Sequence, residues 1–171
     1  MTAFVALLRA VNVGGRKLIM TDLKALAEDL GLTDPRTYIA SGNLLFASDL
    51  PEPQVKARLE KRLAEHMGAS VPVMIRTAPE LDWALKANPF ASVAGNRVAV
   101  IFLDEPPAAN SIETVVNVVD ERIALGKREV YVAYGGQGMG QSRLRIPAAS
   151  SGTARNLNTV AKLAELARET R

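Results

Sequence analysis

Basic, amide and glycine residues gather in the segment that follows the first apolar run of the chain. They are Arg9, Asn12, Gly14, Gly15 and Lys17. Glycines expose backbone N–H groups, and arginine and lysine add positive charge, so this combination favours a phosphate or a carboxylate. The pattern G-x-x-x-x-G-K-[ST] is absent, so the segment is not a P-loop. We expect an anion-binding loop, with a simple strand-to-helix connection as the open alternative.

A second polar group, Ser41-Gly42-Asn43, separates two apolar segments. The pair Gly42-Asn43 is typical of two-residue hairpin turns. We therefore expect strands over 37–40 and 44–47 with a tight turn between them. The polar side chains either orient a bound anion or only form the turn, and the sequence leaves both interpretations open.

A third polar group, Arg155, Asn156 and Asn158, lies where the last helix is expected to begin. An asparagine at that place can accept a hydrogen bond from the first helical N–H groups and cap the helix. The functional alternative is that these three side chains add donors to the same anion site.

The elements around these groups follow from hydrophobic periodicity. In the first half we expect strands over 3–8, 37–40, 44–47 and 71–75, and helices over 21–30 and 53–67. Residues 1–77 therefore have the order β-α-β-β-α-β of a ferredoxin-like unit, with an antiparallel sheet and two helices on one face. In that order the end of the first strand, the start of the first helix and the hairpin turn share one edge of the sheet. The anion-binding loop and the Ser41-Gly42-Asn43 turn are thus expected to be neighbours.

The second half repeats this order of elements without a clear repeat of residues. A capping box, Thr77-Ala78-Pro79-Glu80, opens a linking helix and loop over 78–96. Residues 97–171 then form a second ferredoxin-like unit that is incomplete or modified, because its final strand is missing or displaced. Its elements are a strand over 97–103, a short helix near 112–116, a hairpin over 121–125 and 128–134, a glycine-rich loop that starts at 135, and a helix over 160–167. The predicted fold class is α+β.

Composition excludes several kinds of chemistry. The chain has no cysteine, so disulfides and thiolate metal sites are excluded. Its one histidine, His66, argues against a histidine-rich metal site or a Ser-His-Asp triad, and we expect it to be an ordinary helical surface residue. The acidic residues Asp104, Glu105, Asp120 and Glu121 are expected to be solvated. We therefore predict neither a metal nor a cofactor, and whether any reaction is catalysed stays open.

Charge and hydropathy limit the partners. No apolar run approaches the roughly 18 residues of a membrane span, and the N-terminus lacks the basic start of a signal peptide, so we expect a cytoplasmic protein. The net charge of +3 permits a small anionic ligand. A nucleic-acid-binding module is an alternative, because ferredoxin-like sheets often stack bases on aromatic side chains of the first and third strands, where Phe4 and Phe46 lie. Core packing explains both phenylalanines better. A homodimer formed through an exposed sheet surface is the third alternative.

Several motifs of the chain occur together in one known family. The opening motif is Leu7-Leu8-Arg9-Ala10-Val11-Asn12-Val13-Gly14-Gly15, followed by Met20, Thr37-Tyr38-Ile39, Ser41-Gly42-Asn43, Asn88-Pro89-Phe90 and Arg155-Asn156-Leu157-Asn158-Thr159-Val160. These motifs resemble, in the same order, those of the bacterial family of unknown function DUF1697. The resemblance implies a pair of ferredoxin-like units and no established activity. Two departures are Leu157, where the family usually has tryptophan, and a segment from 142 to 153 that is shorter than in relatives.

Overall fold

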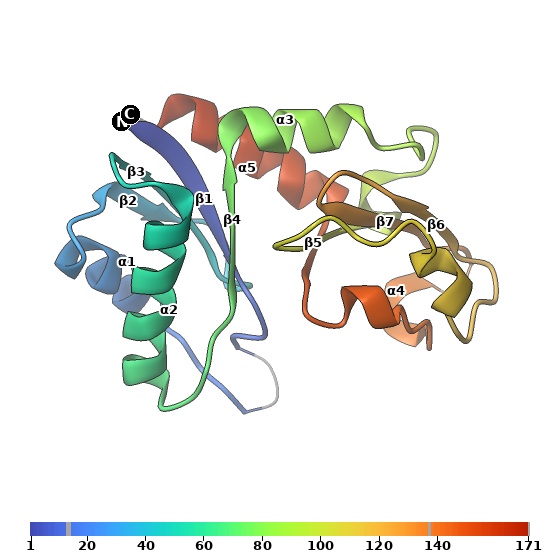
Figure 1. The fold of residues 1–171 in the computed structure, drawn as a ribbon, viewed down its shortest axis with the longest axis horizontal. Helices are drawn as coiled ribbons and strands as arrows, with labels where there is room; N and C mark the ends of the chain where they lie inside the picture. The colour runs from blue at the N-terminus through green and yellow to red at the C-terminus, as the bar shows by residue number, and fades with distance from the viewer. Residues whose placement is uncertain (13–14, 137, 171) are drawn as a thin grey trace. The chain divides into compact units, whose positions relative to one another are not determined.

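The computed structural model describes residues 1–12, 15–136 and 138–170. Across these residues the protein is a mixed α+β structure with five α-helices and two four-stranded antiparallel sheets (Figure 1). The chain divides into two compact units, Met1–Leu81 with Leu163–Arg171, and Asp82–Lys162. Among the described residues, no helix is long and apolar enough to cross a membrane.

The first unit contains four strands and two helices in the order β-α-β-β-α-β. They are β1 (Thr2–Leu8), α1 (Met20–Asp29), β2 (Thr33–Thr37), β3 (Asn43–Ser48), α2 (Glu52–Met67) and β4 (Val73–Thr77). The order of the strands across the sheet is β2-β3-β1-β4, and every neighbouring pair is antiparallel. Strands β1 and β3 are therefore the two central strands, as the order of elements predicts.

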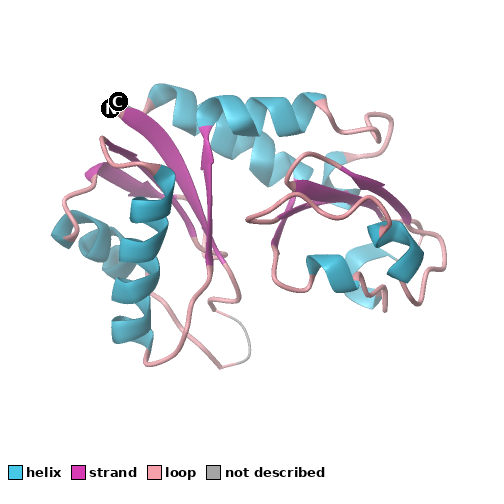
Figure 2. Cartoon of the chain, viewed as in Figure 1, coloured by secondary structure: helices cyan, strands magenta, loops and turns pink. Residues whose placement is uncertain are grey.

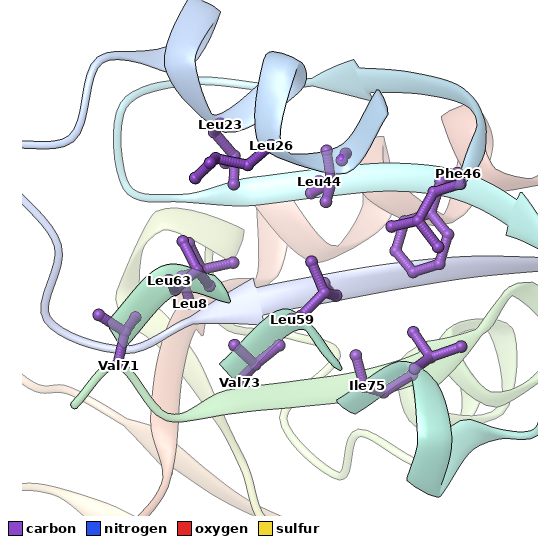
Figure 3. Packing of buried hydrophobic residues seen from close by; sticks show 14 of the residues in the cluster. Leu8, Leu23, Leu26, Leu44, Phe46, Leu59, Leu63, Val71, Val73 and Ile75 are labelled. Atoms are coloured by element: carbon purple, nitrogen blue, oxygen red, sulfur yellow. The ribbon is translucent and has the colours of Figure 1, made fainter. Parts of the chain in front are cut away.

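The core of this unit lies between α1, α2 and one face of the sheet. Alternate strand residues point to this face, and Phe4 pairs with Phe46 across β1 and β3. Figure 3 shows Leu23 and Leu26 of α1 directed toward Leu44. The two phenylalanine rings lie 5.8 Å apart between centroids and are buried, which confirms that they pack in the core.

The predicted position of the second strand is wrong by about one strand length. Strand β2 spans Thr33–Thr37 and not 37–40. Asp34-Pro35 is a turn signal in the sequence, but β2 is an edge strand, and edge strands tolerate proline and bulges. The register of β2 against β3 shifts between Thr33 and Arg36, and Asp34 has φ +50°. Asp34 and Pro35 therefore lie within this bulge of β2 and not in a turn between two elements.

The second unit has its own four-stranded sheet. Its strands are β5 (Val98–Phe102), β6 (Arg122–Leu125), β7 (Glu129–Ala133) and β8 (Thr153–Asn156), with α4 at Gly138–Gln141 and 3₁₀ turns at Gly95–Arg97, Ser111–Thr114 and Pro147–Ala149. Helices α3 (Ala78–Lys86) and α5 (Leu157–Glu169) continue from one unit into the other along the chain. The strand order β6-β7-β5-β8 repeats that of the first sheet, element for element. Figure 2 shows that short helical turns take the place of the long helices of the first unit.

Two expectations for the second unit are wrong. The final strand is present as β8, which the sequence hides because it is short and its buried positions are Thr153 and Arg155 and not apolar residues. The expected helix near 112–116 is a 3₁₀ turn, and Val116 forms a bridge with Arg145 instead. The β-branched side chains that follow the turn disfavour continuation as an α-helix.

Candidate functional site

Asn12 connects the loop after β1 to the turn between β2 and β3. Its Nδ2 donates hydrogen bonds to the carbonyl oxygens of Leu18 (3.0 Å) and Ala40 (2.7 Å), and its Oδ1 accepts from Leu18 N (2.8 Å). These three bonds use both donors of the amide group and its acceptor. The two polar segments therefore lie side by side, and the Asn12 side chain holds them together.

Gly42 lies in contact with the end of β1. It has φ +92°, and a Cβ placed on it would be 2.6 Å from Cγ2 of Val11 and 3.0 Å from Cβ of Leu8. The Leu8 N–H donates to the Gly42 carbonyl at 2.9 Å. Neither the backbone conformation nor the space tolerates a larger residue, so Gly42 is explained by the turn alone.

Asn43 is the first residue of β3 and is fully buried. Its Nδ2 donates to the Tyr38 carbonyl (2.9 Å) and to Oγ of Ser41 (3.1 Å). The Tyr38 N–H donates back to the Asn43 carbonyl at 3.0 Å, so these two residues close the loop. The turn therefore spans residues 39–42, and the expected two-residue turn at Gly42-Asn43 is wrong. Asn43 stabilises this longer turn from inside.

A hollow of about 440 Å³ adjoins the loop that follows β1. It is lined by Gly15, Arg16, Lys17, His66, Met67 and Ala69. The loop thus supplies two basic side chains, and the end of α2 supplies the histidine. Gly15 has φ +84°, a conformation that glycine adopts freely, and open space where a side chain would be.

Arg16 and His66 have defined neighbours at the hollow. An Nη of Arg16 donates to the Ser70 carbonyl at 2.9 Å, which holds the guanidinium at the rim. Nε2 of His66 lies 3.8 Å from Oδ2 of Asp22, close enough for an ion pair but too far for a hydrogen bond. Lys17 is exposed. Neither Arg16 nor His66 belongs to the site that the sequence predicts, although Arg16 lies inside the predicted segment.

Among the described residues of the loop, Arg9 and Asn12 do not line this hollow. The Arg9 N–H donates to the Pro72 carbonyl at 2.9 Å, which fixes the end of β1 beside the start of β4. Gly14 lies outside the described residues. Helix α1 begins at Met20 after Ile19, and no side chain caps this end among the described residues.

The third polar group belongs to the second unit. Asn156 ends β8, and its Oδ1 accepts a hydrogen bond from the Thr159 N–H at 2.9 Å, so it caps α5. Asn158 lies in the first turn of α5, and its side chain packs against the backbone of Gly95. The capping interpretation is confirmed for Asn156.

Arg155 is buried and has an equivalent in the first unit that sequence reasoning missed. Arg155 pairs with Val100 across β8 and β5, as Arg76 pairs with Val5 across β4 and β1. In each case Nη1 donates at 2.9 Å to the carbonyl of the preceding residue, Ile75 or Ala154. Burial lowers the pKa of Arg155 to about 10.

The shared signal in the sequence is an arginine followed by a helix-capping residue. Thr77 follows Arg76 and accepts from the Glu80 N–H at 3.3 Å, while Glu80 accepts from the Thr77 N–H at 2.9 Å. Asn156 follows Arg155 and caps α5 in the same position. The two units therefore share a pattern in which a strand ends with an arginine and a capping residue and a helix follows. A comparison of apolar patterns does not detect this repeat.

Glu121 in the second unit is buried, contrary to the expectation of a solvated acid. The Ser142 hydroxyl donates to its carboxylate, and so do the N–H groups of Val119 (2.7 Å) and Asp120 (3.1 Å). The bond from Ser142, followed by that from Val119, lowers the pKa of Glu121. Among the described residues, no group of three or more histidine, cysteine or acidic side chains is arranged to hold a metal ion.

The structure is that of an α+β protein with two four-stranded sheets of the same strand order and a polar loop after β1. The sequence model of the protein family of unknown function DUF1697 matches residues 1–131. The chain belongs to this family, and the resemblance drawn from its motifs is confirmed.

One solved structure extends the comparison to the whole chain. The conserved bacterial protein SP0830 from Streptococcus pneumoniae is similar with a TM-score of 0.81 over 98% of this chain and 99% of that chain, at 23% sequence identity. At this identity the similarity shows a shared fold. No curated protein matches the sequence.

Proposed function

We propose that the first unit binds a small anionic ligand in the hollow beside the loop after β1. The observation that carries this proposal is the convergence of Arg16, Lys17 and His66 on one hollow of about 440 Å³. A volume of roughly 300–1,000 Å³ is typical of small-molecule sites. Cationic side chains around such a hollow favour an anion.

The Ser41-Gly42-Asn43 turn has a supporting role in this proposal. Asn43 holds the turn, and Asn12 connects the turn to the loop that carries the basic residues. The turn therefore positions the loop and does not contact the ligand. The Asn156 side chain caps α5, and the Arg155 side chain donates to a backbone carbonyl within β8. The proposed site therefore consists of residues of the first unit alone.

We also infer that each unit is a variant of the ferredoxin-like fold. The order β-α-β-β-α-β and the strand order β2-β3-β1-β4 support this assignment for the first unit. The order β6-β7-β5-β8 supports it for the second, with 3₁₀ turns and a short helix replacing the two long helices.

Ligand binding is tested by titration of the isotope-labelled protein with inorganic phosphate, sugar phosphates and nucleotides, followed by backbone NMR. We expect shifts at the amides of Gly15 and Lys17, and a rise in thermal stability because the ligand binds only the folded state. In Lys17→Ala the affinity falls. The matched control is Lys61→Ala, which removes the same charge from an exposed position of α2 that does not line the hollow.

A second variant separates the ligand site from the turn. Asn43→Ala is expected to lower the stability of the ligand-free protein, since it removes buried hydrogen bonds to Tyr38 and Ser41. A neutral effect on the ligand-free protein, together with loss of binding, would contradict the supporting role and place Asn43 in direct contact with the ligand.

A homodimeric interaction module is the second candidate function. Four large apolar side chains in the second unit are 45–73% exposed: Ile112, Val116, Val118 and Val119. Neighbouring exposed apolar residues are typical of protein interaction surfaces. Light scattering at high protein concentration tests this candidate, and a monomer would exclude it. The nucleic-acid alternative is weakened because Phe4 and Phe46 are buried, and binding that stays flat and weak across a salt series would remove it.

A further inference from the structure

The two sheets have four edge strands, β2 and β4 in the first unit and β6 and β8 in the second. An edge strand presents unpaired N–H and C=O groups and can pair with another chain unless they are covered. On β4, Glu60 accepts from the Val73 N–H at 2.9 Å, and Lys56 donates to the Val73 carbonyl at 2.6 Å. Arg76 donates to the Ile75 carbonyl of the same strand. Side chains therefore cover backbone groups on the outer edge of β4.

The edges of β2 and β8 are protected in related ways. Strand β2 contains Pro35 and a bulge, and both features disfavour pairing with a further strand. On β8, the buried Arg155 donates to the Ala154 carbonyl, as Arg76 does on β4. Three of the four edges thus have a feature that disfavours the addition of a strand.

Strand β6 has no comparable protection. It pairs with β7 in a regular register, without a bulge or a proline. The Gly126 N–H donates to the Glu129 carbonyl at 2.7 Å, and in an antiparallel ladder such pairs recur at every second residue. The N–H and C=O groups of Ile123 and Leu125 therefore point away from β7. Among the described residues, no hydrogen bond joins these groups to another element.

We infer, on the basis of the second candidate function, that β6 pairs antiparallel with β6 of a second copy of this chain and joins their sheets at this edge. A dimer with a two-fold axis brings the same strand of both copies together. The outward groups of Ile123 and Leu125 allow three registers, centred on Ile123, Ala124 or Leu125. The register centred on Ala124 places Ile123 opposite Leu125 of the second copy, and a small side chain lies at the axis.

The order of charges along the chain favours the register centred on Ala124. It places Asp120 opposite Arg128 of the second copy and Glu121 opposite Lys127 of the second copy. Opposite charges in facing positions of two strands stabilise their pairing. Asp120 is exposed and Arg128 is partly exposed, whereas Glu121 is buried. The pair of Asp120 with Arg128 is therefore the one to test.

The other two registers lack this match. Centred on Leu125, the pairing would place Arg122 opposite Arg128 of the second copy, and like charges in facing positions are destabilising. Centred on Ile123, it would place Glu121 opposite the apolar Leu125. A segment with acidic residues before the strand and basic residues after it is thus complementary to its own copy.

The exposed apolar side chains of the second unit adjoin this edge. Val118 and Val119 are 50% and 73% exposed and directly precede the segment that leads into β6. Pairing at β6 brings the two copies of these valines close to the joined edge. The apolar surface and the unpaired backbone groups therefore belong to one interface.

Hydrogen exchange of the full chain, followed by NMR at low and high protein concentration, tests the pairing without a substitution. The amides of Ile123 and Leu125 exchange only in the monomer, so their rates are expected to fall about tenfold in a sample that is about 90% dimer by light scattering. The Ala124 amide faces β7 in the monomer as well and is the internal control. An extended peptide of unrelated sequence, added to the dilute monomer, is the control for self-pairing.

A charge exchange tests the register. Asp120→Arg places like charges opposite each other twice in the dimer, and we expect its dimer Kd to rise about tenfold. Adding Arg128→Asp to this variant restores opposite charges and is expected to restore the dimer. Glu105→Arg makes the same change of charge at an exposed position outside β6 and is the matched control. The melting temperature of each variant shows whether it is folded.

The outcomes separate this inference from the homodimer itself. A dimer in which the Ile123 and Leu125 amides exchange as fast as in the monomer overturns the pairing of β6 and leaves a homodimer through another surface standing. Equal protection by the unrelated peptide assigns the edge to other partners and overturns self-pairing. A folded Asp120→Arg variant with the wild-type Kd overturns the register. A monomer at every concentration overturns the inference and the second candidate function together.

Discussion

The connection made by Asn12 predicts a specific pattern of stability changes. Asn12 has φ +57°, a left-handed conformation that asparagine tolerates better than alanine does and that glycine adopts freely. Its side chain makes three hydrogen bonds to Leu18 and Ala40. Asn12→Ala removes the bonds and adds backbone strain, whereas Asn12→Gly removes the bonds without the strain. The two variants therefore separate the side-chain contribution from the backbone contribution.

The magnitude follows from these contacts. A net value of about 0.5–1.5 kcal/mol per hydrogen bond gives a loss of about 1.5–4.5 kcal/mol for the three bonds. The half-buried position of Asn12 favours the lower part of that range, because water can replace some of the lost partners. The left-handed backbone adds roughly 1 kcal/mol for alanine relative to glycine. We expect Asn12→Ala to be less stable than Asn12→Gly, and both to be less stable than the wild type.

Urea unfolding followed by circular dichroism measures these differences, with NMR shifts at Ala40 and Ser41 as the local readout. Asn12→Asp serves as a third variant, since its carboxylate can accept from Leu18 N but cannot donate to the Leu18 and Ala40 carbonyls. It should be at least as unstable as Asn12→Gly. Free energies of unfolding for the alanine and glycine variants within about 0.5 kcal/mol of the wild type would refute the reasoning, because this is the range of ordinary surface substitutions.

Two further predictions concern the turn and the second unit. Gly42→Ala is expected to lower the free energy of unfolding by about 1–3 kcal/mol, the usual cost of overpacking. The new Cβ would lie 2.6 Å from Val11 Cγ2 and 3.0 Å from Leu8 Cβ. A melting temperature equal to that of the wild type would contradict this close approach. Ser142→Ala removes the bond that contributes most to the lowered pKa of Glu121. A carboxylate with a lowered pKa stabilises the folded state above its unfolded pKa and loses this contribution as the pH falls through the folded pKa. The stability difference between wild type and Ser142→Ala should therefore shrink as the pH is lowered below about 4.5, the ordinary value for glutamate; a difference that stays constant would assign the effect of Ser142 to packing.

Much of the first unit could be predicted because its signals are local. The stripe Val55, Leu59 and Leu63 and the glycine that follows α2 define that helix, and both features occur in the structure. The capping box at Thr77 and Glu80 forms as its spacing indicates. Such patterns depend on contacts between residues close in sequence, so the chain carries them without reference to its tertiary structure.

Elements at the edges of the sheets were harder to predict. Strand β2 contains a proline and a bulge, and β8 carries a buried arginine, so neither shows a simple alternation of apolar and polar residues. An edge strand has one partner and fewer constraints on its composition. Its location is therefore decided by the pairing partner and not by its own sequence.

The candidate site likewise has features that the sequence predicts and features that only the structure assigns. The order of elements places the loop after β1 beside the turn before β3, and the bond from Asn12 to Ala40 joins them. The sequence could not assign the roles of the polar side chains within this edge. Asn12 and Asn43 have typical ligand-binding side chains, yet their amide groups are engaged with the backbone. His66 has the context of an ordinary surface helix until the end of α2 is placed next to Arg16 and Lys17.

The sequence by itself determined the family, the α+β class and the neighbourhood of the two polar segments, because hydrophobic periodicity and element order act through short-range rules. Only the tertiary structure decided which polar groups are used for folding and which line a hollow. That distinction depends on hydrogen-bond partners from segments far apart in the chain, such as Ala40 for Asn12 and Ser70 for Arg16. The Asn12 amide has both of its donors bound to backbone carbonyls and cannot also donate to a ligand, whereas the Arg16 guanidinium has five N–H donors and uses one of them on Ser70. No local pattern records where those carbonyls lie.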